Sequence, residues 1–381
     1  MKILFCSFRY DPQNIDSGSG FDYDFFQAFS RHDAEIKVIG PPHYQAFAVE
    51  RLFARLYKKA TGNSYAKFRL SMAYRLSSEL NRNVKIWNPD VVFTIWPNFL
   101  VFYNQKIPTV YSVDTCLYGE HLQWPSYGKL AMKITEWEEK RAFHKCAAII
   151  THSHWTKNII SSHYNIKPDI ITVLPVSASI PTSAIPKKID IRKMKEISKP
   201  IKLLLVGRVF HRKGIDIAIE TVRILNSIGF KAFLSICGMD ENEKFPFVEF
   251  VGLFKKSNQE QLNKYMQLYR DAHLLIHPAR FEAAGIVPSE AAAFGTPTIT
   301  NDAGGLGTTV ADGISGIVLP KDSPSEAYAR AIMDLINDPE RYYRLCETTR
   351  QRYEQELNWD VAGKRVMELV RRVVAEHKDK Q

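Results

Sequence analysis

Two cationic side chains occur where an apolar run of the sequence ends. In the stretch LLLVGRVFHRKGIDIAIE, Arg208 follows Gly207 directly after the run. Lys213 and Gly214 then precede an amphipathic helical pattern. A glycine lets the backbone turn sharply, and an arginine fork together with a lysine point charge can neutralise a diphosphate. The loop therefore predicts a phosphate site, and the alternative is an ordinary surface turn.

Two carboxylates, Glu282 and Glu290, follow further along, with seven residues between them and a helix predicted to begin near Pro288. Backbone N–H groups at a helix start bind anions readily. Glu290, inside that first turn, is placed to accept hydrogen bonds from ribose hydroxyls, as acidic residues do in dinucleotide-binding folds. The alternative is that both acids only stabilise the helix start. The N–H groups expected to point at a ligand are those of Gly285, Ile286 and Val287.

Short apolar runs alternate with helical patterns along the whole chain, which predicts an α/β fold with parallel sheets and βαβ crossovers. Such doubly wound folds bind ligands at the carboxyl ends of their strands, so the residues above would lie on the functional edge of a sheet. The runs expected to be strands are 2–8, 35–40, 91–96, 109–113 and 147–153, followed by 202–207, 232–238, 247–254, 273–279 and 296–302.

With 381 residues the chain exceeds one ordinary core, and we expect two domains facing across a cleft. The first covers 1–180 and the second 201–359. Residues 181–200 are the predicted linker, because prolines, serines and lysines interrupt any periodicity there. The segment after Pro339 is strongly helical, with a break near Asn358 and Trp359.

Composition places the chain among ordinary globular proteins, with 45% hydrophobic and 24% charged residues. No run approaches the ~20 apolar residues that span a bilayer, and the N-terminus reads as a strand rather than a leader. The five cysteines lack a C-x-x-C pair, which suits buried thiols in a reducing cytoplasm. We therefore expect a cytoplasmic protein, either soluble or peripheral on the inner face of the membrane.

The net charge of +10 is unevenly distributed, because 51–85 holds nine Lys or Arg and one acid, Glu79. Apolar residues at helical spacing predict two basic amphipathic helices broken at Gly62-Asn63. One interpretation is docking on anionic lipid, worth about 1 kcal/mol per basic residue, and the other is a solvated helical face over a core. Nucleic acid is not expected as a partner, since no recognised binding motif accompanies the charge.

Five ordered motifs between 202 and 320 resemble the donor-binding domain of glycosyltransferase family 4, which comprises retaining enzymes with the GT-B fold. The resemblance implies two Rossmann-like doubly wound domains, an acceptor-binding N-terminal domain to which a helix at 360–381 crosses back, and a C-terminal domain for a nucleotide sugar. The motifs are G-R-x4-K-G at 207–214, E-x7-E at 282–290, G-T-P at 295–297, A-G-G at 303–305 and D-G-x-x-G at 312–316.

The same resemblance implies roles for single residues. Arg208 and Lys213 would hold the donor diphosphate, Glu282 a hydroxyl of the donor sugar, and Glu290 the ribose. The nucleoside-diphosphate sugar is then the co-substrate, without a cofactor, and a donor phosphate oxygen takes the acceptor proton. No protein nucleophile is needed, because the cations and helix-start N–H groups stabilise the leaving diphosphate.

The first half matches the family more loosely. Gly18 and Gly20 follow the first strand and resemble the glycine loop near the donor phosphates, whereas a dinucleotide fingerprint would need a third glycine. Asp114 stands where many family members carry histidine. It can bond a sugar hydroxyl or orient the acceptor, and the alternative is a strand-end cap.

No metal site is expected. Asp22 and Asp24 have D-x-D spacing but lie in a helical pattern, where residues two apart do not share a face. The sequence leaves open the base and sugar of the donor, the identity of the acceptor and the oligomeric state. We expect the acceptor to be a glycan or a lipid-linked molecule. The alternative function is a non-catalytic, basic membrane-docking or scaffold protein of the same fold.

Overall fold

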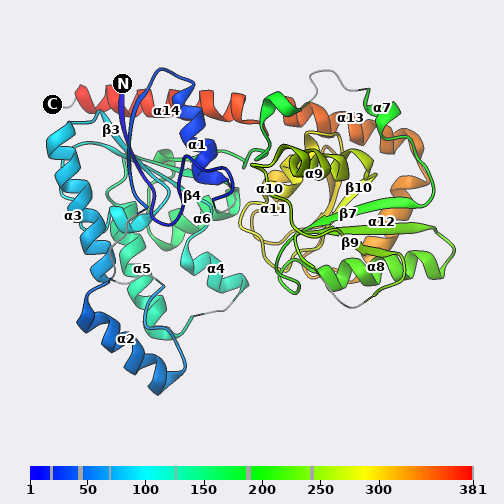
Figure 1. Ribbon diagram of the computed structural model, residues 1–381, viewed down its shortest axis with the longest axis horizontal. Helices are drawn as coiled ribbons and strands as arrows, with labels where there is room; N and C mark the ends of the chain where they lie inside the picture. Colours follow the sequence, from blue (N-terminus) through cyan, green and yellow to red (C-terminus); the bar gives the residue numbers. More distant parts are fainter. Residues whose placement is uncertain are drawn as a thin grey trace. The chain divides into compact units, whose positions relative to one another are not determined.

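Alternating strands and helices build two units, each around one parallel sheet (Figure 1). The computed structural model describes residues 1–17, 20–41, 46–67, 70–124, 127–185, 190–240 and 244–379. The first unit comprises Met1–Leu174 and Gly363–Gln381, and the second comprises Pro175–Ala362.

The sheet of the first unit has the strand order β2-β1-β3-β4-β5-β6. Its inner strands are buried on both faces, as expected for a parallel sheet covered by helices. The chain moves to one side of β1 to form β2 and to the other side to form β3, so the loops after β1 and β3 diverge at this point. The strands are β1 Lys2–Cys6, β2 Glu35–Ile39, β3 Val91–Thr94, β4 Thr109–Val113, β5 Ala148–Thr151 and β6 Ile171–Val173.

Seven α-helices accompany this sheet in the described part of the chain. The predicted break at 62 is confirmed, since Gly62 ends the first of the two basic helices in a left-handed conformation with φ 73°. The helices are α1 Phe21–Ser30, α2 Ala48–Thr61, α3 Leu70–Trp87, α4 Leu117–Gln123, α5 Lys129–Phe143, α6 His154–His163 and α14 Trp359–Lys378, which begins in the second unit.

The sheet of the second unit has the order β12-β11-β10-β7-β8-β9, the arrangement of dinucleotide-binding folds. The direction in which successive strands are added to the sheet reverses between β7 and β10. These two parallel strands pair directly through Leu203 and Leu274. The loops after these two strands are the two loops that carry the predicted phosphate-binding residues. The strands are β7 Ile201–Val206, β8 Ala232–Cys237, β9 Val248–Phe250, β10 Leu274–His277, β11 Thr298–Asn301 and β12 Gly316–Leu319.

The expected linker at 181–200 falls inside the second unit. In its described part, Ile185 and Ile191 are buried in the core of that unit, and the Lys195 ammonium donates to three carbonyls at the end of α9, those of Tyr269, Arg270 and Ala272. The helices of this unit are α7 Ile191–Met194, α8 Ile215–Ser227, α9 Gln259–Asp271, α10 Ile286–Ala292, α11 Leu306–Thr309, α12 Ser325–Ile336 and α13 Pro339–Gln355.

Each unit has its own core. In the first, the Phe93 ring packs on Phe5 and Phe29, with centroids 5.4 and 4.8 Å apart. In the second, Tyr269 stacks on Phe294 at 6.1 Å. All five cysteines are free and buried, which confirms the expectation of buried thiols.

The predicted break near Asn358 separates α13 from α14. The Asn358 side-chain oxygen accepts the N–H groups of Asp360 and Val361 at 3.1 and 3.0 Å, so it starts a new helix in the manner of an N-cap. Within the first unit, Gly363 of α14 lies so close to Ala28 of α1 that an added Cβ would be 3.1 Å from the alanine methyl. The tail of the chain thus packs on the first unit through a small-residue contact.

Candidate functional site

The loop after β7 lies directly against the loop after β10. Gly214 has φ 66°, and a Cβ added to it would be 1.9 Å from the carbonyl oxygen of Pro278. Arg280 strengthens the contact with two bonds to the Asp216 carboxylate, at 2.8 and 2.6 Å, and one to the His211 carbonyl at 2.7 Å. The reversal point of the sheet therefore carries two loops held in one fixed arrangement.

Lys213 and Glu282 meet where these loops touch. The Lys213 ammonium bonds to Oε2 of Glu282, Arg212 Nη1 lies 3.4 Å from the same oxygen, and both members of the ion pair are largely buried. Burial alone raises the pKa of Glu282, but the positive charges of Lys213 and Arg212 outweigh it and hold the pKa well below its usual range. The carboxylate is therefore ionised at neutral pH and available as a hydrogen-bond acceptor.

His277, at the end of β10, is fully buried beside this pair. Its Nε2 lies 3.8 Å from Glu282 Oε2, too far for a hydrogen bond, and neither ring nitrogen has a partner among the described residues. Burial lowers its pKa, which favours the neutral imidazole. Sequence reasoning missed both His277 and Arg212, although the first ends a strand and the second adjoins Lys213.

The predicted glycine positions shape the rest of the loop. Gly207, whose N–H bonds the Cys237 carbonyl at 2.8 Å, has room only for a hydrogen, since a Cβ would lie 2.7 Å from the Lys213 side chain. Gly285 has φ 85° and directly precedes α10, so the helix starts at Ile286, two residues before the expected position. Gly304 of the A-G-G motif lies against the Glu282 carbonyl, and a Cβ added to it would be only 2.3 Å from that oxygen. Arg208 is exposed at the start of its loop.

Glu290 lies on α10 with Val287 one turn before it, and its carboxylate is 1% exposed. Lys256 donates to Oε1 at 2.7 Å, and the hydroxyls of Tyr265 and Tyr269 donate to Oε2 at 2.6 and 2.8 Å. The expected contact of Glu290 with a ribose stays a prediction. In this structure the group that covers the carboxylate is Lys256.

The candidate residues of the first unit lie on loops after β1 and β4. Gly18 is outside the described residues, while Gly20 has φ 82° and begins α1. Asp114 is exposed, and its Oδ1 accepts the Thr115 N–H at 2.8 Å, a local bond of the kind that caps a strand end. Its contact with an acceptor stays a prediction.

Asp22, not among the predicted site residues, is buried and accepts a hydrogen bond from Ser7 Oγ at 2.5 Å. Burial raises its pKa to about 6, although hydrogen bonds from Ser7 and Trp96 oppose the shift. No cluster of three or more His, Cys, Asp or Glu suited to a metal, with or without Asp22 and Asp24, occurs in the described part of the chain.

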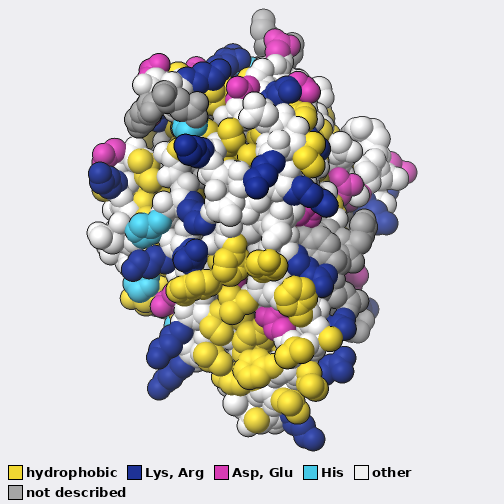
Figure 2. Space-filling view, turned by 90° about the vertical axis from the view of Figure 1, so that its left-hand side faces the viewer, with side chains coloured by type: hydrophobic (Ala, Val, Ile, Leu, Met, Phe, Trp, Pro, Cys, Tyr) yellow, Lys and Arg dark blue, Asp and Glu magenta, His cyan; other side chains and the backbone are white. Residues whose placement is uncertain are grey.

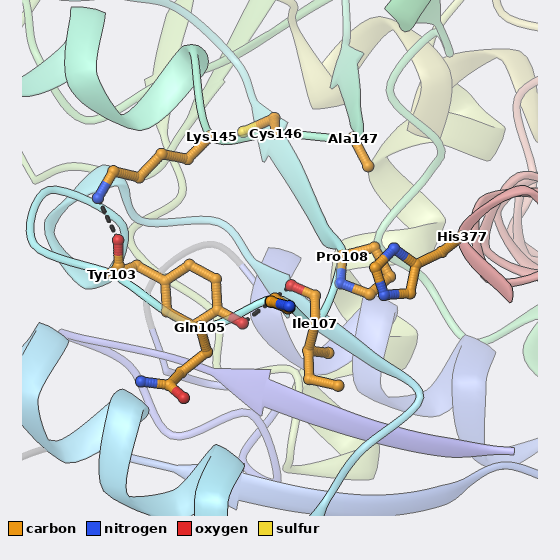
Figure 3. A pocket seen from close by; sticks show the side chains of 9 residues that line it. Tyr103, Gln105, Ile107, Pro108, Lys145, Cys146, Ala147 and His377 are labelled. Atoms are coloured by element: carbon orange, nitrogen blue, oxygen red, sulfur yellow. Dashed lines mark hydrogen bonds between the residues drawn. The ribbon is translucent and has the colours of Figure 1, made fainter. Parts of the chain in front are cut away.

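A hollow of about 360 Å³ in the first unit lies away from the loops after β1 and β4 (Figure 3). Pro108 and Ala147 line it directly before β4 and β5, and His377 of α14 reaches its rim. The hollow therefore opens at the amino ends of the strands, opposite the edge where doubly wound folds bind ligands.

Two family descriptions match the chain. Glycosyl transferases group 1 matches residues 186–352, and Glycosyltransferase Family 4 matches residues 23–176. Together with two Rossmann-like units and a cation–carboxylate cluster at the reversal point of the second sheet, these matches define a glycosyltransferase of the GT-B class. The chain belongs to glycosyltransferase family 4.

Individual proteins agree with this assignment. Glycogen synthase of Mycobacterium tuberculosis is 24% identical over 321 residues, 79% of this chain and 74% of its own length. The lipopolysaccharide glucosyltransferase WaaG of Escherichia coli is 33% identical over 174 residues, 43% of this chain and 46% of its own. HepE of Anabaena, solved in complex with UDP-glucose, has the same fold, with a TM-score of 0.64 at 16% identity over 97% of this chain and 98% of its own.

Proposed function

We propose that this protein transfers a hexose from a nucleoside-diphosphate sugar to an acceptor, with retention of the anomeric configuration. The observation that carries the proposal is the Lys213–Glu282 pair, held by fixed loops at the reversal point of the second sheet. A buried cation next to an ionised carboxylate presents opposite charges to the two chemically different halves of a sugar diphosphate, the anionic diphosphate and the hydroxylated ring.

In the proposed reaction, Lys213, Arg212 and Arg208 stabilise the negative charge that develops on the leaving diphosphate. These cations supply the positive charge that a divalent ion supplies in other transferases, so the proposed transfer is metal-independent and uses no cofactor. The N–H groups of 285–287 add hydrogen bonds to the phosphate and sugar. Glu282 accepts a hydrogen bond from a hydroxyl of the donor sugar and so orients the anomeric carbon of that sugar.

The proton balance requires no further base from the protein. As the bond between the anomeric carbon and the diphosphate breaks, the acceptor oxygen bonds to the same face of the sugar. Its proton passes to the departing phosphate oxygen. The products are the glycosylated acceptor and the nucleoside diphosphate, and the anomeric configuration is retained.

The test is a donor panel of UDP-, GDP- and ADP-hexoses, each incubated with the protein and a bacterial membrane-lipid fraction. We expect one donor to release its nucleoside diphosphate faster than the others and to label the lipid fraction, and we expect nuclear magnetic resonance to show retained configuration in the product. If no donor releases its nucleoside diphosphate faster than it does in an enzyme-free blank, the proposal is contradicted.

For the acceptor, we propose a lipid-linked or membrane-surface glycan, reached by a cytoplasmic protein docked on the inner face of the membrane. The support is helix α2, which is fully described and has no buried residue. Its apolar side chains face outward, with Val49 81%, Leu52 57% and Leu56 58% exposed. Figure 2 shows hydrophobic side chains gathered on this face of the first unit, with Lys and Arg around them.

Hydrogen bonds and an aromatic contact attach α2 to the unit. Phe53 packs edge-on against Tyr65, with ring centroids 5.2 Å apart. Glu50 accepts hydrogen bonds from the Tyr65 hydroxyl and from the N–H and hydroxyl of Ser71. Ser71 Oγ in turn accepts the Phe47 N–H at 3.0 Å. Among the described residues no helix is long and apolar enough to cross a bilayer, so α2 would lie in the membrane interface.

Replacing Leu52, Phe53 and Leu56 together by serine is expected to weaken binding to anionic liposomes at least about ten-fold, because each such side chain contributes about 1.5–3 kcal/mol when it is fully buried in lipid. Neutralising Arg55, Lys58 and Lys59 is expected to weaken binding at low salt only. Liposome flotation measures both. Lys67 is left intact, since it pairs with Glu120 at 2.6 Å inside the unit.

The matched control is Ile228→Ser, which removes a side chain of similar exposure, 58%, from the second unit. Flotation that is equally strong for the triple serine variant and for Ile228→Ser would contradict docking through α2.

A further inference from the structure

A buried histidine lies at each end of strand β10, and the two have opposite surroundings. His273, directly before the strand, uses both ring nitrogens. Its Nδ1 accepts the Lys202 N–H at 2.9 Å, and its Nε2 donates to the Glu196 carbonyl at 3.2 Å. His277, the last residue of the strand, is fully buried, but neither ring nitrogen has a hydrogen-bond partner among the described residues. The first imidazole therefore links parts of the fold, whereas the second does not.

An unpartnered imidazole is unfavourable in a protein interior. A neutral imidazole has one N–H donor and one acceptor nitrogen, and burying them without partners costs free energy that an apolar side chain would not cost. Burial lowers the pKa of His277, so the ring is neutral and both groups need partners. A residue that destabilises the fold and lies next to a ligand site indicates a role in that site.

The Glu282 carboxylate lies next to this ring. His277 Nε2 is 3.8 Å from Glu282 Oε2, which is also the oxygen to which Lys213 is bonded. Within the described part of the chain, the other oxygen, Oε1, accepts no hydrogen bond, and the Glu282 side chain keeps 15% of its surface exposed. Oε2 is therefore held by the protein, and Oε1 is the oxygen open to a ligand.

A bound donor would change the surroundings of Glu282, because its diphosphate attracts the same cation. The Lys213 ammonium is bonded to Glu282 in this structure, and in the proposed reaction it stabilises the leaving diphosphate. As the ammonium turns toward the diphosphate, Oε2 loses hydrogen bonding in a largely buried place. A movement of about 1 Å would bring the His277 ring within hydrogen-bond distance of that oxygen.

We propose that His277 is a positioning residue for Glu282. In the donor complex its Nε2–H donates to Oε2, and Oε1 stays directed at the sugar hydroxyl. The imidazole acts through the carboxylate and does not touch the donor. The inference rests on the proposed function, because it presupposes a sugar diphosphate at the Lys213–Glu282 pair. It also explains the unpartnered ring, which gains its hydrogen bond when the donor binds.

The first test separates stability from transfer. His277→Leu replaces the imidazole by an apolar side chain of similar volume, so Tm in a thermal melt should stay the same or rise. We expect kcat/KM for the nucleotide sugar to fall about 10- to 100-fold, the effect of one hydrogen bond to a charged group. Affinity for the nucleoside diphosphate should fall by less, because no sugar hydroxyl is present to be oriented. His277→Gln keeps an N–H donor and should restore most of the transfer.

His273→Leu is the matched control, because it makes the same change at the other end of the same strand. It removes hydrogen bonds that the structure contains, so Tm should fall. The kcat/KM of the folded enzyme should stay within about two-fold of the wild type, since His273 lies at the amino end of the strand, away from Glu282. The two histidines thus predict opposite patterns of stability and transfer.

A second test uses the wild-type protein and does not depend on the folding of a variant. The Nε2–H proton of His277 is observed by nuclear magnetic resonance and assigned by its absence from His277→Gln. The preferred nucleoside diphosphate is then added, because its diphosphate draws Lys213 away from Glu282. We expect the signal to move downfield as the bond to Oε2 forms.

Three results would overturn the inference and leave the proposed function intact. His277→Leu could transfer sugar as fast as the wild type, or its loss of transfer could be accompanied by the loss of stability expected of His273→Leu. The Nε2–H signal could also stay in place although the nucleoside diphosphate binds. A wild type that neither transfers sugar nor binds a nucleoside diphosphate would instead contradict the proposed function, and the inference with it.

Discussion

Replacing Lys213 by methionine is expected to lower kcat about 10²- to 10³-fold, the usual effect of removing one preorganised charge that stabilises a transition state. Lys213 is 9% exposed and bonded to Glu282 at the reversal point, so water cannot easily take its place. Steady-state kinetics with the donor found by the panel measures the change. Because the charge acts mostly on the leaving diphosphate, we expect kcat to fall more than KM rises.

Two comparisons isolate this effect. Lys231→Met removes an exposed lysine of the same unit and should leave kcat unchanged. Glu282→Gln keeps the shape of the partner while removing its charge, and it should lose sugar binding while Lys213 remains. A Lys213→Met enzyme with the kcat of the wild type would contradict the assigned role.

Gly214→Ala is expected to destabilise the second unit by at least about 3 kcal/mol. A left-handed residue with a Cβ costs about 1–2 kcal/mol, and the clash 1.9 Å from the Pro278 carbonyl must in addition push one backbone segment off another. For a unit of this size such a loss lowers Tm by roughly 6–12 °C, which a thermal melt resolves. Activity should fall as well, because the loops that hold Lys213 and Glu282 would separate.

Gly229→Ala is the natural control for this substitution. Gly229 also has a positive φ, 81°, but nothing lies within 4 Å of its added Cβ, so it carries the conformational cost alone. Equal melting temperatures for the two variants would show that the contact between the loops contributes nothing.

Much of the fold can be predicted from the sequence, because the spacing of apolar residues and the residues that end or start helices determine it. The apolar runs of the two halves are strands, Gly62 ends α2, and Asn358 starts α14. The ordered motifs also placed Lys213 and Glu282 on loops that do touch. Each of these features depends on residues near one another in the chain or on a strand order common to doubly wound folds.

Features that depend on tertiary contacts were not readable in this way. Glu290 and Lys256 are 34 residues apart, and nothing in the spacing says that a lysine would cover the carboxylate. The proline-rich stretch 181–200 looked like a linker, yet Ile191 and Lys195 are buried in the second unit. Helical periodicity in α2 was equally compatible with a packed face, and only the structure shows its leucines exposed.

The measurement that tests the central claim most directly is calorimetric titration of the preferred nucleoside diphosphate into the wild type and Lys213→Met. If the loops after β7 and β10 hold the donor diphosphate, the wild type binds one equivalent and the variant binds at least about ten times more weakly. Equal affinity for both proteins, or a wild type that binds no nucleoside diphosphate, would contradict the account.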